Sequence, residues 1–313
     1  MYEIVTLAEL KTWLNVDGTT KDTFLAQLID QVTDLIEGIL SKKIVTRSFT
    51  EYHNGRGKPN LLSKNYPIYK VTSLYDDSEH DYGATDLIAT DDYRIDYDYG
   101  QIQLTDDEVV FYNGEQNVKL IYWAGFSRFN LVDESNNYLD VYETSTNGAV
   151  AIELTPPTTP DDTRYPGYSA EDLASALQTA LRANTTLTLQ YNVSYNHSTQ
   201  KFIFSTSTNF DLQFYTGTNA AKNMATLLGF STSTDTNAGT SHTSDSAVNG
   251  VPNDLKTAAF MICQKFLSDS PEGGGNLLNT SKTLPQGGGT FSLITDIPER
   301  AKKILDQYTA VLI

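Results

Sequence analysis

Two stretches decide how this chain is organised: VKLIYWAGF at residues 118–126 and VPNDLK at residues 251–256. The first is typical of a strand that ends in an aromatic-Ala-Gly-aromatic sequence, and the second opens a helix that continues with apolar residues. The residues between them are rich in Thr, Ser and Asn. We therefore predict a core formed by residues 1–136 and 250–313, interrupted by an inserted module over residues 137–249.

The N-terminal part of the core is predicted to be helical. Thr6 and Glu9 have the spacing of a capping box, in which a hydroxyl and a carboxylate satisfy free N–H groups of the first turn. The apolar residues of this first helix are Leu7, Leu10, Trp13 and Leu14. Apolar residues then recur at helical spacing over 24–40, which predicts a long helix buried against other helices. Two further helices are expected over 254–267 and from 298 onward.

Short β-type runs follow the long helix. Turn signals such as Asn54-Gly55 and Asn113-Gly114 separate them. A small sheet is stable only when one face is covered, so we expect these strands to pack against the long helix. The predicted strands lie at residues 44–52, 61–62, 68–71, 93–96, 102–104 and 118–123.

The inserted module is predicted to be α+β. A helix should begin at Ser169, and Leu187–Tyr195 alternates apolar and polar residues as a half-buried strand does. Further strands are expected over 202–204 and 210–214, and a short helix over 219–228 should end at Gly229 with Phe230 folded back onto it. Residues 231–246, rich in Ser and Thr, should form a mobile loop or an edge segment. The fold class of the whole chain is therefore α+β.

Composition excludes several functions. With 313 residues the chain can form two domains. A net charge of -17 argues against a surface that grips nucleic-acid phosphates. The single Cys263 lies in an apolar run and is expected to be a buried thiol. No apolar run is long enough to cross a bilayer, so we expect no membrane contact and synthesis in the host cytoplasm.

No arrangement of residues indicates an active site. Four histidines lie far apart and lack a second ligand at metal spacing: His53, His80, His197 and His242. The Gly triplets at 273–275 and 287–289 lack the Gly-Lys-Ser/Thr ending of a phosphate loop. Acidic pairs such as Asp76-Asp77, Asp91-Asp92 and Asp106-Asp107 fit no calcium-loop spacing and are expected to be solvated turns. We therefore predict no catalytic, cofactor-binding or metal residues, and no enzyme.

The order of these parts resembles the head-to-tail connector (adaptor) family of tailed bacteriophages over roughly residues 3–126 and 251–313. The fragments that carry the resemblance are Lys11 and Glu37 in the first two helices, then residues 67–71, 122–126, 251–256 and 305–308. The resemblance implies a helical bundle with a small antiparallel sheet, which forms a ring of twelve subunits beneath the portal. Such a ring extends the DNA channel and provides the docking surface for the tail.

This resemblance implies partners and sites. The expected partners are the portal protein, a tail completion or tail terminator protein and, for the module, the major capsid protein, while packaged DNA passes through without specific binding. The expected location is the head-to-tail junction of the virion. Portal contacts are predicted for the terminal helix, at Ile304, Leu305, Tyr308 and Leu312. Ring or tail contacts are predicted for the stretches at residues 118–126 and 251–256, at Trp123, Phe126, Asp254 and Lys256.

Two other functions stay open at this point. A tail-tip or baseplate component could recognise a host-surface ligand through the Tyr-rich module, and exposed aromatic side chains beside a polar groove would favour it. A hydrolase would need two carboxyl groups facing one pocket. The acidic charge also has two interpretations, since it either repels DNA from a channel wall or keeps the free subunit soluble.

Overall fold

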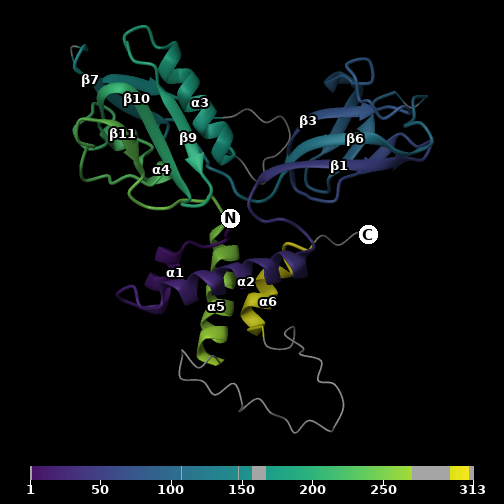
Figure 1. Cartoon of the computed structure of the whole chain (residues 1–313), viewed down its shortest axis with the longest axis horizontal. Coiled ribbons are helices and arrows are strands. Elements are labelled where there is room, and N and C mark those ends of the chain that lie inside the picture. The colour runs from purple at the N-terminus through teal and green to yellow at the C-terminus, as the bar shows by residue number, and fades with distance from the viewer. Residues whose placement is uncertain (1, 107, 147, 157–166, 270–296, 310–313) are drawn as a thin grey trace. The chain divides into compact units, whose positions relative to one another are not determined.

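A computed structural model describes residues 2–106, 108–146, 148–156, 167–269 and 297–309. The chain has a mixed α+β fold, as the sequence predicts, and its described residues form three antiparallel sheets. It divides into two compact units (Figure 1). We call Glu3–Ile44 with Val251–Ile313 the helical unit, and residues 1–2 with Val45–Gly250 the β unit. Among the described residues, no helix has both the length and the hydrophobicity to cross a bilayer.

The helical unit joins the two ends of the sequence. Helices α1 (Leu7–Leu14) and α2 (Asp22–Leu40) pack with α5 (Asn253–Asp269) and α6 (Glu299–Leu305) (Figure 1). The predicted capping box is present, because Thr6 Oγ1 accepts the Glu9 N–H at 3.1 Å and a Glu9 oxygen accepts the Thr6 N–H at 2.8 Å. Buried residues on α2 follow the predicted apolar stripe: Leu25, Leu28, Ile29, Val32, Ile36 and Leu40. On α5, Cys263 is buried, as expected.

The first part of the β unit contains two small sheets. Strands β1 (Arg47–Gly55), β6 (Gly114–Ala124) and β3 (Ile68–Asp76) form one sheet in the order β1-β6-β3. Strands β2 (Asn60–Leu62), β5 (Gln101–Leu104) and β4 (Tyr93–Asp96) form the other, in the order β2-β5-β4, and a short 3-10 helix η1 (Thr90–Asp92) precedes β4.

The predicted cover of this sheet by the long helix is wrong. The buried residues of β3 and β6 share one hydrophobic cluster with those of β4 and β5, so the second sheet covers the first. The side chains that cover the first sheet lie on β4 and β5, two short strands for which the sequence analysis assigned no partner strand: Tyr93, Ile102 and Leu104. Tyr122 is fully buried in the same cluster.

The second part of the β unit is a five-stranded sheet with a helix packed on it (Figure 1). Its strands are β7 (Tyr138–Glu143), β8 (Val150–Glu153), β9 (Asn192–Asn196), β10 (Lys201–Leu212) and β11 (Gly239–Thr243). Its helices are α3 (Ala170–Ala183), η2 (Ala220–Lys222) and α4 (Ala225–Leu228). Residues of α3 lie in one core with those of β7–β10, and this core is separate from that of the first part. The predicted stop at Gly229 is confirmed, with φ +81° and the Phe230 N–H bonded to Ala225 O at 2.9 Å.

Strand boundaries in this part differ from the predictions. The two strands expected over 202–204 and 210–214 form one strand, β10, which ends at Leu212. The alternating stretch Leu187–Tyr195 pairs only from Asn192 onward, as β9. The reason is that the N–H groups of Thr188 and Leu189 bind the Glu143 carboxylate instead of a neighbouring strand. Of the Ser/Thr-rich residues 231–246, part forms β11 at the edge of the sheet.

The chain enters and leaves this second part at adjacent points. The N–H of Arg128 donates to the carbonyl oxygen of Gly250 at 2.8 Å. Gly250 has φ +63°, and a Cβ there would lie 2.8 Å from the Arg128 carbonyl oxygen, so glycine permits this close approach. The hydrophobic core of this part begins at Phe129, before the predicted boundary at 137. The predicted division of the chain stays a prediction. In it, residues 1–136 and 250–313 form a connector core, and residues 137–249 are inserted into that core.

Candidate functional site

Asp254 and Lys256, predicted for a ring or tail contact, both form polar contacts inside the helical unit. The Tyr308 hydroxyl donates to the Asp254 carboxylate, at 2.6 Å from each oxygen. The Lys256 ammonium lies 2.6 Å from Glu9 Oε1. Glu9 therefore serves two helices, because its other oxygen completes the capping box of α1. These contacts join α1, α5 and the residues that follow α6.

The predicted portal residues divide between the inside and the surface of the helical unit. Leu305 is buried, and Ile304 and Tyr308 are half-buried. The Lys42 ammonium donates to the Tyr308 carbonyl oxygen at 2.8 Å, which adds a contact with the end of α2. Leu312 and the Gly-rich stretch from residue 270 lie outside the described residues. The structure thus brings together Tyr308 and Asp254, which the sequence had assigned to different contacts.

Trp123 and Phe126 lie in the β unit. Trp123 is half-buried at the end of β6, and its ring lies 5.4 Å from the Lys70 ammonium. That ammonium also forms an ion pair with Asp172 at the start of α3, at 2.6 Å. Phe126 is only 3% exposed and therefore contributes to the fold of the subunit. Of this pair, Trp123 presents the more accessible side chain.

An aromatic pair on the helical unit, with one exposed and one half-buried ring, was not predicted. Trp13 is 44% exposed, and its ring stacks on that of Phe260 with 5.1 Å between ring centres. The indole N–H donates to Gln264 Oε1 at 3.2 Å. The sequence placed Trp13 on the apolar face of the first helix, but that helix buries only Leu10. No signal in a single sequence separates such a surface aromatic from a core residue.

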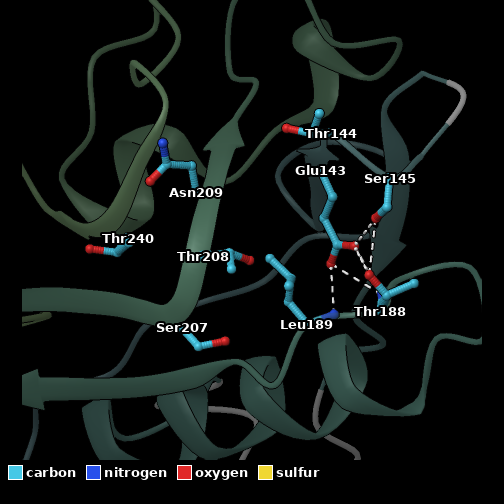
Figure 2. Close-up of a pocket in the computed structure, with 9 residues that line it drawn as sticks. All are labelled: Glu143, Thr144, Ser145, Thr188, Leu189, Ser207, Thr208, Asn209 and Thr240. Atoms are coloured by element: carbon cyan, nitrogen blue, oxygen red, sulfur yellow. Dashed lines mark hydrogen bonds between the residues drawn. The ribbon is translucent and has the colours of Figure 1, made fainter.

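The β unit contains a polar cavity of about 540 Å³ beside Glu143 (Figure 2). Most of the described residues that line it carry hydroxyl or amide groups, and none is aromatic: Glu143, Thr144, Ser145, Thr188, Leu189, Ser207, Thr208, Asn209 and Thr240. Tyr215, the most exposed aromatic among the described residues of this part at 60%, does not line the cavity. Among the described residues, the lining of this cavity therefore does not combine a polar groove with exposed aromatic rings, the arrangement that would favour a host-surface ligand.

The Glu143 carboxylate is fully used by the protein. It accepts the N–H of Thr188 at 2.9 Å and that of Leu189 at 3.1 Å, and the hydroxyl of Tyr191 at 2.9 Å (Figure 2 draws the first two). Burial alone would raise the pKa of Glu143, but these hydrogen bonds outweigh it and hold the pKa below its ordinary value of 4.5. A charged, saturated carboxylate of this kind organises loops and does not act as a general base.

Two groups of three carboxylates occur among the described residues, and every member except buried Asp77 is at least partly exposed. Asp77, Asp81 and Asp86 form one group, and Asp133, Glu134 and Glu153 form the other. In the first, Asp77 accepts the backbone N–H groups of Glu79, Asp81 and Tyr82, each at 2.7 Å. These bonds lower the pKa of Asp77 and explain the group as an ordered turn.

Comparison with known proteins supports a connector. Residues 4–70, which contain α1, α2, β1 and β2, match the family model of the phage gp6-like head-tail connector protein. The resemblance predicted from the sequence is therefore confirmed over these residues. By its description this is a structural connector family and not an enzyme family. No curated protein matches the sequence.

Some solved structures contain chains with a partial likeness. One is from the virion of a native gene transfer agent particle, with 20% identity, a TM-score of 0.33, and 39% of this chain and 66% of that chain covered. Another is from the neck of an empty particle of this kind computed with C6 symmetry, with 19% identity, a TM-score of 0.33 and the same coverage. A third is from the neck of a native particle computed with C12 symmetry, with 18% identity, a TM-score of 0.30, and 40% and 68% covered.

Proposed function

We propose that this protein is a structural component of a tailed-phage or prophage virion, placed at the head-to-tail junction. It forms a ring beneath the portal, extends the DNA channel and provides a surface on which the tail docks. The observation that carries the proposal is the match of residues 4–70 to the connector family. Because this match ends early in β3, the role of the remaining residues rests on their geometry.

The packing of the chain ends supports a connector core that tolerates an insertion. Residues 3–44 fold with residues 251–313 as one helical unit, although more than half of the sequence separates them. The hydrogen bond between Arg128 and Gly250 closes the entry and exit of the second β part. A module whose ends lie together can be added to a fold without disturbing the elements on either side. We therefore assign residues 137–249 to an inserted module.

The proposed partners are the portal protein, a tail completion or terminator protein and, through the module, the major capsid protein. The predicted portal residues Ile304, Tyr308 and Leu312 and the predicted ring or tail residue Trp123 stay proposals. The predicted residues Leu305, Phe126, Asp254 and Lys256 also stay proposals, and in the subunit Leu305 and Phe126 are buried. DNA passes without specific contacts, consistent with a net charge of -17.

Native mass spectrometry of the purified protein, alone and mixed with the portal protein of the same genome, tests this function. We expect a subunit that becomes a roughly twelvefold ring on the portal, in keeping with the ring that the connector resemblance implies. A stable trimer or hexamer that ignores the portal would contradict the proposal. Such a result would favour the alternative, a tail-tip or baseplate component that binds a host-surface ligand. The cavity beside Glu143 gives this alternative no support, because its lining contains no aromatic side chain.

A further inference from the structure

The first part of the β unit has two outer faces, one on each of its two sheets. Val118 and Leu120 lie in the core between the sheets. Lys119 therefore points to the other side of β6, because side chains alternate along a strand. On β4, Ile95 packs against the same core and Asp96 is exposed. Lys119 and Asp96 thus lie on opposite outer faces of one folded part.

An aromatic row crosses the outer face of the sheet formed by β1, β6 and β3 (Figure 1). It consists of Tyr52, Lys119 and Tyr75, which lie directly opposite one another on the three strands. The ammonium lies 6.0 Å from the centre of the Tyr52 ring, 5.6 Å from that of Tyr75 and 4.9 Å from that of Tyr82. Among the described residues it has no hydrogen bond and no ion pair. Lys70, farther along this face, already has an ion-pair partner.

An acidic row crosses the outer face of the sheet formed by β2, β5 and β4. It consists of Leu62, Gln101 and Asp96, which also lie directly opposite one another. Leu62 is 57% exposed, and Tyr99, whose N–H donates to Asp96 Oδ1 at 3.2 Å, is 50% exposed. The other oxygen of Asp96 has no partner in the described part of the chain. Arg94 lies one row farther along the sheet.

We propose that the aromatic row of one copy of this chain binds the acidic row of the next copy, with Lys119 paired to Asp96. This contact rests on the proposed ring of subunits. A surface that binds a different surface of the next copy makes a heterologous contact, which generates a ring if the rotation between copies closes. Rows on opposite faces of one folded part suit this arrangement, because each copy then has a neighbour on either side.

The two rows have complementary chemistry. The ammonium lacks an anion on its own copy and the Asp96 carboxylate lacks a cation, so each supplies what the other needs. Tyrosine rings are typical of interface centres, because they bury a large area at a small cost in side-chain entropy. Leu62 provides an apolar group for the rings to cover. Two like rows cannot pair, since that would bring two ammonium groups or two carboxylates together.

Charge reversal in the full chain tests this contact. Lys119→Glu and Asp96→Lys each place like charges at every contact, and each should lower the fraction assembled on the portal about tenfold. Native mass spectrometry measures this fraction, and circular dichroism checks that each variant folds. Glu108→Lys is the matched control, because Glu108 is exposed and lies outside both rows, and it should assemble as the wild type does.

Two combinations of these variants should restore assembly. In an equimolar mixture of Lys119→Glu and Asp96→Lys, opposite charges meet at every contact when the two variants alternate around the ring. The double variant that carries both changes should assemble with itself but stay out of wild-type rings, because both of its contacts with the wild type join like charges. Lys119→Gln keeps the length of the side chain, and it should lose part of the assembly even if charge reversal disturbs the fold.

The outcomes separate this contact from the proposed function. A wild-type ring on the portal, together with unchanged assembly of Lys119→Glu, Lys119→Gln and Asp96→Lys, would overturn the contact and leave the connector function intact. Failure of both the mixture and the double variant to recover would also overturn it. A wild-type chain that forms no ring on the portal would contradict the proposed function and this contact together.

Discussion

Glu143 illustrates how one buried side chain can organise two segments of the chain. Glu143 is the last residue of β7. Its carboxylate accepts the backbone N–H groups of Thr188 and Leu189, which have no partner strand. A hydrogen bond to a charged group contributes more than a neutral one, because the buried charge needs each donor. The order of the cavity wall beside it therefore depends on this one residue.

We expect Glu143→Gln to lower the free energy of unfolding by about 3 kcal/mol, because an amide nitrogen would face N–H donors. Urea denaturation followed by circular dichroism measures the change. Glu108→Gln is the matched control, since Glu108 is exposed, and it should change stability by less than about 0.5 kcal/mol. Equal effects of the two substitutions would show that the Glu143 network contributes little.

The loss in Glu143→Gln should depend on pH. Folding lowers the pKa of Glu143 below 4.5, so the folded state favours the charged form. Its contribution is fully present above pH 4.5 and disappears as the pH falls through the lower, folded-state pKa. The difference in stability between the wild type and Glu143→Gln should therefore be constant from pH 6 to 7 and shrink below pH 4.5. A difference that grows on acidification would contradict this sign.

At the scale of elements, α1 depends on its cap because it is only 8 residues long and buries little. Thr6→Ala removes the hydroxyl that accepts the Glu9 N–H and should cost about 1 kcal/mol. Glu9→Ala should cost more, because it also removes the partner of Lys256. Thermal unfolding of both variants tests this order. A larger loss from Thr6→Ala than from Glu9→Ala would mean that the contact with α5 contributes nothing.

Helix α6 is short and is stabilised mainly by what it packs on. Ala301 and Leu305 are buried, and the Tyr308 hydroxyl binds Asp254. We therefore expect deletion of residues 297–313 to unfold the helical unit, and Tyr308→Phe to lower its stability by about 1–2 kcal/mol. Hydrogen exchange, read separately for the two units, measures both effects. A truncated chain that stays folded and loses only portal binding would instead support a direct portal contact by α6.

At the scale of the whole molecule, the two hydrophobic cores of the β unit predict two parts that fold independently. The core from Phe129 to Phe230 contains no residue of the first two sheets. We expect residues 127–250 alone to unfold cooperatively. We also expect the rest to fold when a short Gly-Ser link replaces residues 131–248, because Arg128 and Gly250 are adjacent. Two-dimensional NMR of both fragments checks this, and a collapsed spectrum for either would contradict it.

Local features could be predicted from the sequence. The capping box at Thr6, the apolar stripe of α2, the stop at Gly229 and the buried Cys263 all depend on neighbours within a few residues or on one helical face. Such features follow from hydrogen bonding and periodicity that a single segment carries. The connector resemblance was also accessible, because residues 4–70 retain the family pattern.

The predictions that failed, and the contacts that were missed, involve distant segments. The sequence assigned the long helix to cover the sheet of β1, β6 and β3, although a second sheet does so. It extended a strand through residues 187–191, whose N–H groups bind Glu143 instead.

The sequence by itself determined the capping box of α1, the apolar stripe of α2, the helix stop at Gly229, the acidic charge and the resemblance to connectors. Only the tertiary structure decided which groups meet: Tyr308 with Asp254, and Lys256 with Glu9 across 247 positions of the chain. The physical reason is that a charged or polar side chain can be satisfied by many partners of the same chemistry. Which one it finds depends on how the whole chain packs, and periodicity in one segment contains no record of that choice.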